Sequence, residues 1–324
     1  MKFDRKLVIA IVIVCVSVAL VYALTQRPTG EMTTIKFGDI RGVPNIAQHV
    51  ALEKGYFEGE GIDAQISFLG AGMHVDAAVS GDIDIGLTSP TEAMSAIAAG
   101  APIKMIGLVG YGEPWRNAGV IVALNGSGIE TVEDLRGKRI AVSYPSDVDH
   151  LYLLETLEKR GVEDAELVFV LWPMQIEALV GGDVDAVQMI PYYTAVMDIE
   201  GIDYTILEKP QGISERKDVA VLIASIDRIE TRKDDLKKFL KVYYKVNSYL
   251  EENPEIHVEY LVKYAGWRPE VAQILEEKGE IINLSPDGRF NRISMSKLMR
   301  LMVDSGFIEE EIPLEDLITE ELLT

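Results

Sequence analysis

The sequence has little of what several protein classes need. Its 324 residues contain a single cysteine, Cys15, and four histidines, with no HExxH, CxxC, GxSxG or P-loop pattern. One cysteine excludes intramolecular disulfides, cysteine-based zinc sites and iron–sulfur clusters. The missing motifs give no support to a zinc protease, a serine hydrolase or a P-loop enzyme. We therefore expect no catalytic residue, no metal and no cofactor.

Positive charge is also scarce. Lysine and arginine number 31 against 52 aspartates and glutamates, so the formal net charge is −21. Binding to a phosphate backbone needs clustered Lys and Arg, which excludes nucleic acid as an expected partner. The hydrophobic fraction of 48% is enough to fill packed cores, and the length favours about two domains.

One long apolar run stands near the start of the chain. Leu7–Leu24 contains no charged residue, and as a helix it would span about 27 Å, close to the hydrocarbon thickness of a bilayer. Positive residues precede it and favour a cytoplasmic start, which places the body outside the cytoplasmic membrane. We predict that residues 1–24 are a signal peptide or a membrane anchor, and that 25–34 form a linker.

Two stretches of the body repeat one order of elements. Residues 35–87 and 139–189 each read strand, helix, strand, short helix and strand, and each carries a Gly-Asp-x-Asp tetrad, at 81–84 and 182–185. Alternating strands and helices with short connections indicate parallel sheets with right-handed crossovers. We predict an α/β clamshell with parallel-sheet lobes and an N-terminal hydrophobic helix. Lobe 1 is expected over 35–118 plus 224–324 and lobe 2 over 119–223, hinged near 118–121 and 219–223.

Ligands of open parallel sheets bind beyond the carboxyl ends of the strands. In the first lobe this rule selects Arg41, Pro44, Asn45, Gly70, Ala71, Gly72, His74, Thr88 and Ser89, with Trp115 near the first crossing. In the second lobe it selects Ser143, Tyr144, Ser146, Trp172, Pro191 and Tyr192. Hydroxyls, backbone amides and aromatic rings suit a small ligand held without chemistry. The alternatives are helix capping by Thr88, Ser89, Ser146 or Asp147, and a tight turn at the glycines.

Several segments resemble one known family. ALEKGYFEGEGID (51–63), SGDIDIGL (80–87), AAGAPIKMIG (98–107), GIETVEDLRGKRIAV (128–142) and GGDVDAV (181–187) are similar to solute-binding proteins of ABC transporters that bind nitrate, taurine, alkanesulfonates or thiamine pyrimidines. The resemblance covers roughly residues 35 to 225. It implies a periplasmic-binding-protein-like fold of type II and a monomer. Such a protein closes on a small molecule and presents it to a permease with a cytoplasmic ATPase.

The resemblance leaves the ligand open between a nitrate-, sulfonate- or taurine-like anion and a pyrimidine-like ring. Sulfonate-type members tend to show other residues where this chain has Tyr144-Pro145-Ser146 and Met189-Ile190-Pro191-Tyr192. The alternatives to transport are an enzyme of the same fold, of the thiamine-pyrimidine synthase or menaquinone-precursor type, and a membrane-tethered ligand sensor. The synthase group uses a cysteine-rich motif that Cys15 alone does not supply.

Overall fold

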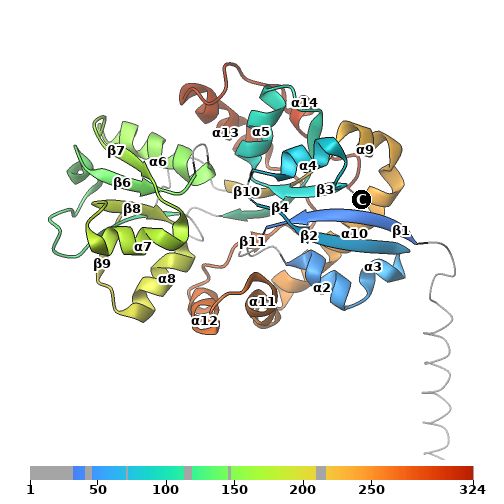
Figure 1. Cartoon of the computed structure of the whole chain (residues 1–324), viewed down its shortest axis with the longest axis horizontal. Coiled ribbons are helices and arrows are strands. Elements are labelled where there is room, and N and C mark those ends of the chain that lie inside the picture. The colour runs from blue at the N-terminus through green and yellow to red at the C-terminus, as the bar shows by residue number, and fades with distance from the viewer. Residues whose placement is uncertain are drawn as a thin grey trace, which may run out of the picture.

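The computed structural model describes residues 32–40, 46–70, 72–112, 119–144, 147–208 and 217–323. Within them the chain forms two sheets in two lobes that lie side by side (Figure 1). The six-stranded sheet has the order β11-β4-β10-β3-β1-β2, with β1 Thr33–Asp39, β2 Ile62–Phe68, β3 Ile85–Thr88, β4 Ile103–Gly112, β10 Lys217–Ser225 and β11 Asn283–Leu284. The five-stranded sheet has the order β7-β6-β8-β5-β9, with β5 Val120–Leu124, β6 Arg139–Val142, β7 Glu166–Phe169, β8 Ala186–Met189 and β9 Tyr204–Glu208.

Helices cover both faces of each sheet. In the first lobe they are α2 Ala47–Glu53, α3 Tyr56–Gly59, α4 His74–Ser80, α5 Pro90–Ala98, α9 Ile226–Thr231, α10 Lys233–Glu252, α11 Pro254–Tyr260, α12 Pro269–Glu277, α13 Arg292–Asp304 and α14 Leu314–Leu317. In the second they are α6 Val148–Lys159, α7 Trp172–Gly181 and α8 Pro191–Glu200. The core beneath α2 and α10 contains stacked rings of Phe37, Phe57 and Phe239, and a second core lies under α4, α5 and α13. The predicted two-lobed α/β architecture is therefore confirmed.

The expectation of purely parallel sheets is wrong. β1 pairs in parallel with β2 and β3, and β6 with β7 and β8, but β10, β11, β5 and β9 pair antiparallel with their neighbours. The reason is the edge at which the crossing strands, β5 and β10, enter each sheet. Val120 at the start of β5 lies opposite Met189 at the end of β8. A strand that arrives from the other lobe starts at the edge where the parallel strands stop, so it runs the opposite way.

The two Gly-Asp-x-Asp tetrads have the same structural role in the two lobes. Gly81 and Gly182 end α4 and α7 with φ of +82° and +77°, a backbone conformation that glycine adopts without a Cβ penalty. The last aspartate of each tetrad then binds the first strand of its unit: Asp84 Oδ2 accepts the Lys36 N–H at 2.8 Å, and Asp185 Oδ2 accepts the Arg139 N–H at 2.8 Å. The repeat seen in the sequence is thus a repeat of backbone connections.

The signal peptide or membrane anchor expected at 1–24 remains a prediction, because residues 1–31 lie outside the described residues. β1 begins at Thr33, so the last two residues of the linker expected at 25–34 belong to a strand. Among the helices that the structure does describe, none combines the length and apolar character needed to cross a membrane. β10 pairs along its length with β3 and β4, which groups residues 217–223 with the first sheet, earlier than the boundary at 223 that we expected.

Candidate functional site

The carboxyl ends of the parallel strands in the two lobes face each other. β1 runs toward the second lobe in Figure 1, and the crossing strands β5 and β10 enter at these same edges. Helix N-termini, with their free N–H groups, follow directly after β3, β6, β7 and β8. The space between these edges is where this architecture offers a ligand site, and we call it the cleft.

One side of the cleft lies beside the crossing strands, and we call it the base. Lys217 at the start of β10 forms an ion pair with Asp149 of α6, and its Nζ lies 4.7 Å from the centroid of the Tyr152 ring. A Cβ added at Gly119, just before β5, would lie 2.8 Å from Asp149 Oδ1. α6 also packs against α13 of the first lobe. The base is therefore one of two sides on which the lobes are in contact.

The opposite side, the mouth, is held by α8 and α12. Two ion pairs and one ring contact join them: Lys278–Asp198 at 2.8 Å, Arg268–Glu200 at 3.2 Å, and the rings of Tyr192 and Trp267 with centroids 5.1 Å apart. Exposed ion pairs of this kind are each worth about 0–1 kcal/mol. α8 also packs Ala195, Tyr192, Val196 and Ile199 against the apolar core of the first lobe, so the lobes are in apolar contact at the mouth as well as at the base.

Thr88 and Ser89 form hydrogen bonds with the first turn of α5, at the edge of the first lobe. Ser89 is the N-cap, and its Oγ accepts the Glu92 N–H at 3.1 Å, so the capping alternative is confirmed for this residue. Thr88 Oγ1 donates to Glu92 Oε2 at 2.5 Å. The other oxygen, Glu92 Oε1, is buried and has no hydrogen-bond partner within the described ranges. Among the described residues, Glu92 therefore has a hydrogen-bond donor at only one of its two carboxylate oxygens.

Asp147 provides a second carboxylate across the cleft. It caps α6, accepting the Val148 N–H at 2.6 Å, as its position before the helix predicted. Burial first and the nearby Asp149 second raise the pKa of Asp147 to about 7, while Lys217 opposes both. Glu92 of the first lobe also raises the pKa of Asp147, as the smallest of these effects.

The raised pKa predicts how stability changes with pH. Because the carboxyl titrates at about 7 in the folded chain against 3.8 in the reference state, folding favours the protonated form, and stability falls as the pH rises from about 4 to about 7. Asp147→Asn keeps a capping oxygen and removes the charge. We expect it to stabilise the protein on the order of 2 kcal/mol above pH 7 and to have little effect near pH 4. Urea unfolding at several pH values measures this, and an effect independent of pH would contradict it.

Aromatic side chains line the second lobe's edge of the cleft. Tyr144 is 39% exposed, and its ring meets Trp172 edge-on with centroids 5.9 Å apart. Tyr192 and Tyr193 also meet edge-on at 5.1 Å. Burial raises the pKa of Tyr193 to about 12, and the nearby phenols of Tyr192 and Tyr144 add to this increase. Pro191, buried beneath them, starts α8.

His74 lies away from solvent. It is 0% exposed, its Nε2 is 3.4 Å from the carbonyl oxygen of Asp39, and burial lowers its pKa. The ring packs against the first sheet, where a Cβ added at Gly38 would lie 3.2 Å from its Cδ2. Its role toward a ligand stays a prediction. Gly72, just before it, has φ of +83°, which supports the tight-turn alternative.

The structure thus brings several of the expected residues to the two edges and leaves others outside its described ranges. Those placed at the edges are Gly70, Gly72, Thr88, Ser89, Ser143, Tyr144, Trp172, Pro191 and Tyr192. Those outside the described residues are Arg41, Pro44, Asn45, Ala71, Trp115 and Ser146. Ligand contact by any of them stays a prediction.

Sequence reasoning missed an ion pair at the end of β1. Asp39, 1% exposed, bonds His49 Nε2 of α2 at 2.6 Å, and the imidazole is stacked between Phe68 at 5.6 Å and Tyr264 at 4.9 Å. Tyr264 lies more than 200 residues further along the chain, so no local pattern signals the contact. Glu92 was also missed, although the spacing Ser89-x-x-Glu92 is that of a capping box. Within the described ranges, no three His, Cys, Asp or Glu side chains are placed to hold a metal ion.

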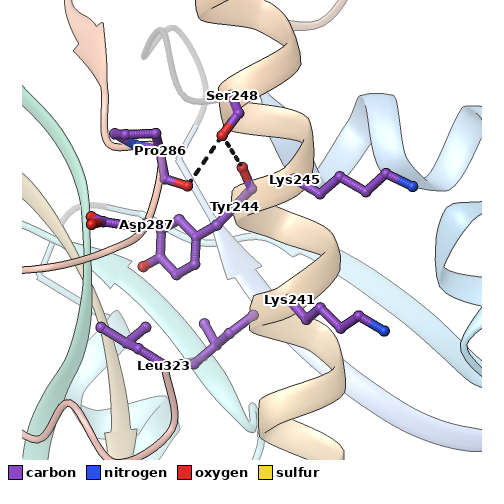
Figure 2. Close-up of a pocket in the computed structure, with 8 residues that line it drawn as sticks. Lys241, Tyr244, Lys245, Ser248, Pro286, Asp287 and Leu323 are labelled. Atoms are coloured by element: carbon purple, nitrogen blue, oxygen red, sulfur yellow. Dashed lines mark hydrogen bonds between the residues drawn. The ribbon is translucent and has the colours of Figure 1, made fainter.

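A hollow of about 170 Å³ opens elsewhere, on the outside of the first lobe along α10 (Figure 2). Its two lysines are engaged away from it: Lys241 pairs with Glu60 at 2.8 Å, and Lys245 lies 5.3 Å from the centroid of the Tyr56 ring. Figure 2 shows both ammonium groups pointing away from Asp287. The residues that line this hollow all come from the first lobe, so it is separate from the cleft between the lobes.

Comparison with known proteins agrees with this architecture. The sequence pattern described as "NMT1/THI5 like" matches residues 44–256, about two thirds of the chain. The chain belongs to the NMT1/THI5-like family. A relative of this NMT1/THI5-like chain, the putative aliphatic sulfonates-binding protein of Escherichia coli, is 31% identical over 152 residues, which is 46% of each protein. The resemblance inferred from the sequence motifs is confirmed.

Two further similar proteins, one by sequence and one by structure, show how much of the chain the comparisons cover. The 4-amino-5-hydroxymethyl-2-methylpyrimidine phosphate synthase of Schizosaccharomyces pombe is 29% identical over 138 residues, 42% of this chain and 38% of that protein. The chain therefore matches less than half the length of these curated relatives. The periplasmic aliphatic sulphonate binding protein SsuA of Escherichia coli has a similar structure, with a TM-score of 0.74 and 18% identity over 90% of this chain and 93% of that one. At that identity the likeness shows the fold.

Proposed function

We propose that the protein is the extracytoplasmic solute-binding component of an ABC importer. It captures a small molecule between its lobes and delivers it, chemically unchanged, to a membrane permease. The observation that carries this proposal is the cleft itself: two strand-end edges from different lobes face each other, with contacts between the lobes at the base and at the mouth. The sulfonate-binding relative supports the same role.

Closure follows from contacts on both lobes. A ligand that touches the Thr88–Glu92 edge and the Tyr144–Trp172 edge binds the closed state better than the open one, and only this difference in affinity shifts the equilibrium. The acidic surface suits encounter with basic permease residues. The apolar run before the body, with positive residues ahead of it, would export or anchor the protein as a monomer at the outer face of the membrane.

The synthase relative favours a second candidate, an enzyme on the same fold. One experiment separates the two. The full chain is purified under native conditions, and the small molecules that it carries are released and identified by mass spectrometry. The importer proposal expects a stoichiometric solute that is recovered unaltered after long incubation with fresh protein. Catalytic conversion of that solute would favour the enzyme and contradict the importer.

A further inference from the structure

The internal repeat includes exposed side chains as well as core residues. Residues 68–84 of the first lobe and 169–185 of the second correspond at a constant offset of 101 positions, and α4 and α7 both end at the first glycine of their tetrad. Buried residues such as Ile83 and Val184 correspond because each fills the core of its own lobe. Three exposed pairs also correspond: Met73 with Met174, Asp76 with Glu177, and Val79 with Val180. Folding alone does not require exposed residues to match.

The matched methionines are large apolar side chains in solvent. Met73 is 55% exposed and Met174 is 56% exposed, and both valines are exposed as well. Apolar side chains grouped on a surface with polar neighbours are typical of sites that bind another macromolecule, and methionine adapts well to such contacts. α4 and α7 therefore present the same kind of binding surface, one on each lobe.

A matched phenylalanine precedes each helix. Phe68 ends β2 and Phe169 ends β7, both rings are exposed, and each lies against a histidine of its own lobe. The ring centroids are 5.6 Å apart for His49 and Phe68 and 6.0 Å apart for His150 and Phe169, and the histidines are again 101 positions apart. We call the two sets of exposed residues the matched faces: Phe68, Met73, Asp76 and Val79 in the first lobe, and Phe169, Met174, Glu177 and Val180 in the second.

The matched faces occupy equivalent places in the two lobes. β2 is separated from the crossing strand β10 by two strands, and β7 is separated from the crossing strand β5 by two strands. Figure 1 shows α4 above the strands of the first sheet and α7 below β6 and β8 of the second, the arrangement of a two-fold repeat. Since lobe closure turns about the crossing strands, a partner that contacts both faces also detects how far the lobes have closed.

The charge of the matched faces indicates a basic partner. Residues 73–83 and 174–184 contain no lysine or arginine, and their exposed carboxylates are Asp76, Asp82, Glu177 and Asp183. The guanidinium groups near the ends of the two helices, those of Arg228 and Arg139, pair with the last aspartates of the tetrads. An anionic lipid surface or a second copy of these faces would meet like charge, whereas a protein with exposed lysine or arginine would be attracted.

We propose that the two matched faces dock onto the permease, each on one of two equivalent subunits of a two-fold symmetric dimer. A two-fold partner presents one surface twice, which is what a chain with two matched faces fits. Each permease subunit would supply an apolar contact for the methionine and a lysine or arginine for the carboxylate. This inference rests on the proposed importer function and identifies the surface through which that function is exerted.

Charge reversal tests the proposal in cells that carry each full-length variant as their only copy. Asp76→Lys and Glu177→Lys are each expected to lower the initial rate of solute uptake about 10-fold, the order of one lost charge contact, and by similar factors. The purified variants should still carry the solute in the amount found for the unaltered protein. Glu58→Lys on α3 and Glu158→Lys on α6 make the same charge change at other exposed positions and should leave uptake unchanged.

Photo-cross-linking identifies the partner. Benzoylphenylalanine is placed at Val79 or at Val180 of the full chain, in membranes of the cells that make the protein naturally, with Glu58 and Glu158 as control positions. We expect both test positions to give an adduct with the same membrane-spanning polypeptide, and the control positions to give none. Adducts with lipid, with a second copy of this chain or with two different polypeptides, or no adduct at all, would overturn the proposal.

The results separate the docking surface from the importer function. If the protein carries a solute and supports its uptake, but the face variants behave like the controls, the docking proposal fails and the importer function stands. If the protein carries no solute and uptake does not depend on it, the importer function fails, and the cross-links alone decide the docking faces. Thermal unfolding identifies any variant that has not folded, and the corresponding variant on the other lobe then decides.

Discussion

Asp84→Ala is expected to lower the free energy of unfolding by about 3 kcal/mol or more, the usual cost of breaking a buried charge pair. The Asp84 side chain is 4% exposed and lies 3.1 Å from Arg228 Nε and 2.9 Å from Arg232 NH1. It also accepts the Lys36 N–H. Its removal leaves the Lys36 N–H without its acceptor. The substitution also takes from Arg228 and Arg232 the most buried carboxylate that they contact, although Asp227 and Asp235 remain beside them.

The second lobe supplies a matched control for this substitution. Asp185 occupies the same place in its unit and accepts the Arg139 N–H, but its side chain is 32% exposed and Arg139 Nε is 3.5 Å away. Asp185→Ala should therefore cost only about 1 kcal/mol, close to one ordinary hydrogen bond. Urea unfolding followed by circular dichroism compares the two variants. Equal losses would contradict the unequal roles given to the two aspartates.

Gly107→Ala is the second substitution with a large expected effect. The added Cβ would overlap the hydroxyl oxygen of Tyr244, a residue of α10. Figure 2 shows this ring beside Asp287, and a Cβ at the next residue, Gly288, would also overlap the ring. Tyr244 is 6% exposed, so its ring has no open space to move into. We expect a loss of about 3 kcal/mol, at the upper end of overpacking effects, or failure to fold.

Tyr244→Phe tests the cause of that loss. The Tyr244 hydroxyl is buried and has no hydrogen-bond partner within the described ranges, so its removal should be neutral or stabilising by about 1 kcal/mol. In the double variant the nearest ring atom would lie 3.0 Å from the new Cβ, which a small shift relieves. Recovery of most of the lost stability is therefore expected in thermal unfolding. A double variant as unstable as Gly107→Ala would show that the overlap is not the cause.

The sequence predicted the parts of the fold that depend on local pattern. The Gly81 and Gly182 tetrads, the Ser89 cap and the alternation of strands and helices all arise from residues within a few positions of each other. The antiparallel strands were missed because direction in a sheet depends on where β5 and β10 enter it, which only the whole topology determines.

The site was predictable in outline for the same reason. Carboxyl ends of parallel strands meet by rule, so Thr88, Ser89, Tyr144 and Trp172 were expected at the edges. The ion pair between Lys217 and Asp149 was not predictable, because the two residues come from elements 68 positions apart in the sequence. The partner of a buried carboxylate is set by tertiary packing rather than by spacing along the chain.

The distance between the lobes tests the central claim most directly. Spin labels at Leu52→Cys on α2 and Val180→Cys on α7, both exposed positions, would be introduced into a Cys15→Ser background. Double electron–electron resonance then records the distance distribution with and without the solute identified by mass spectrometry in the purified protein. The account predicts a shorter distance when this solute is bound and a return to the original distribution after its removal. An unchanged distribution at a concentration where calorimetry shows saturation would contradict it.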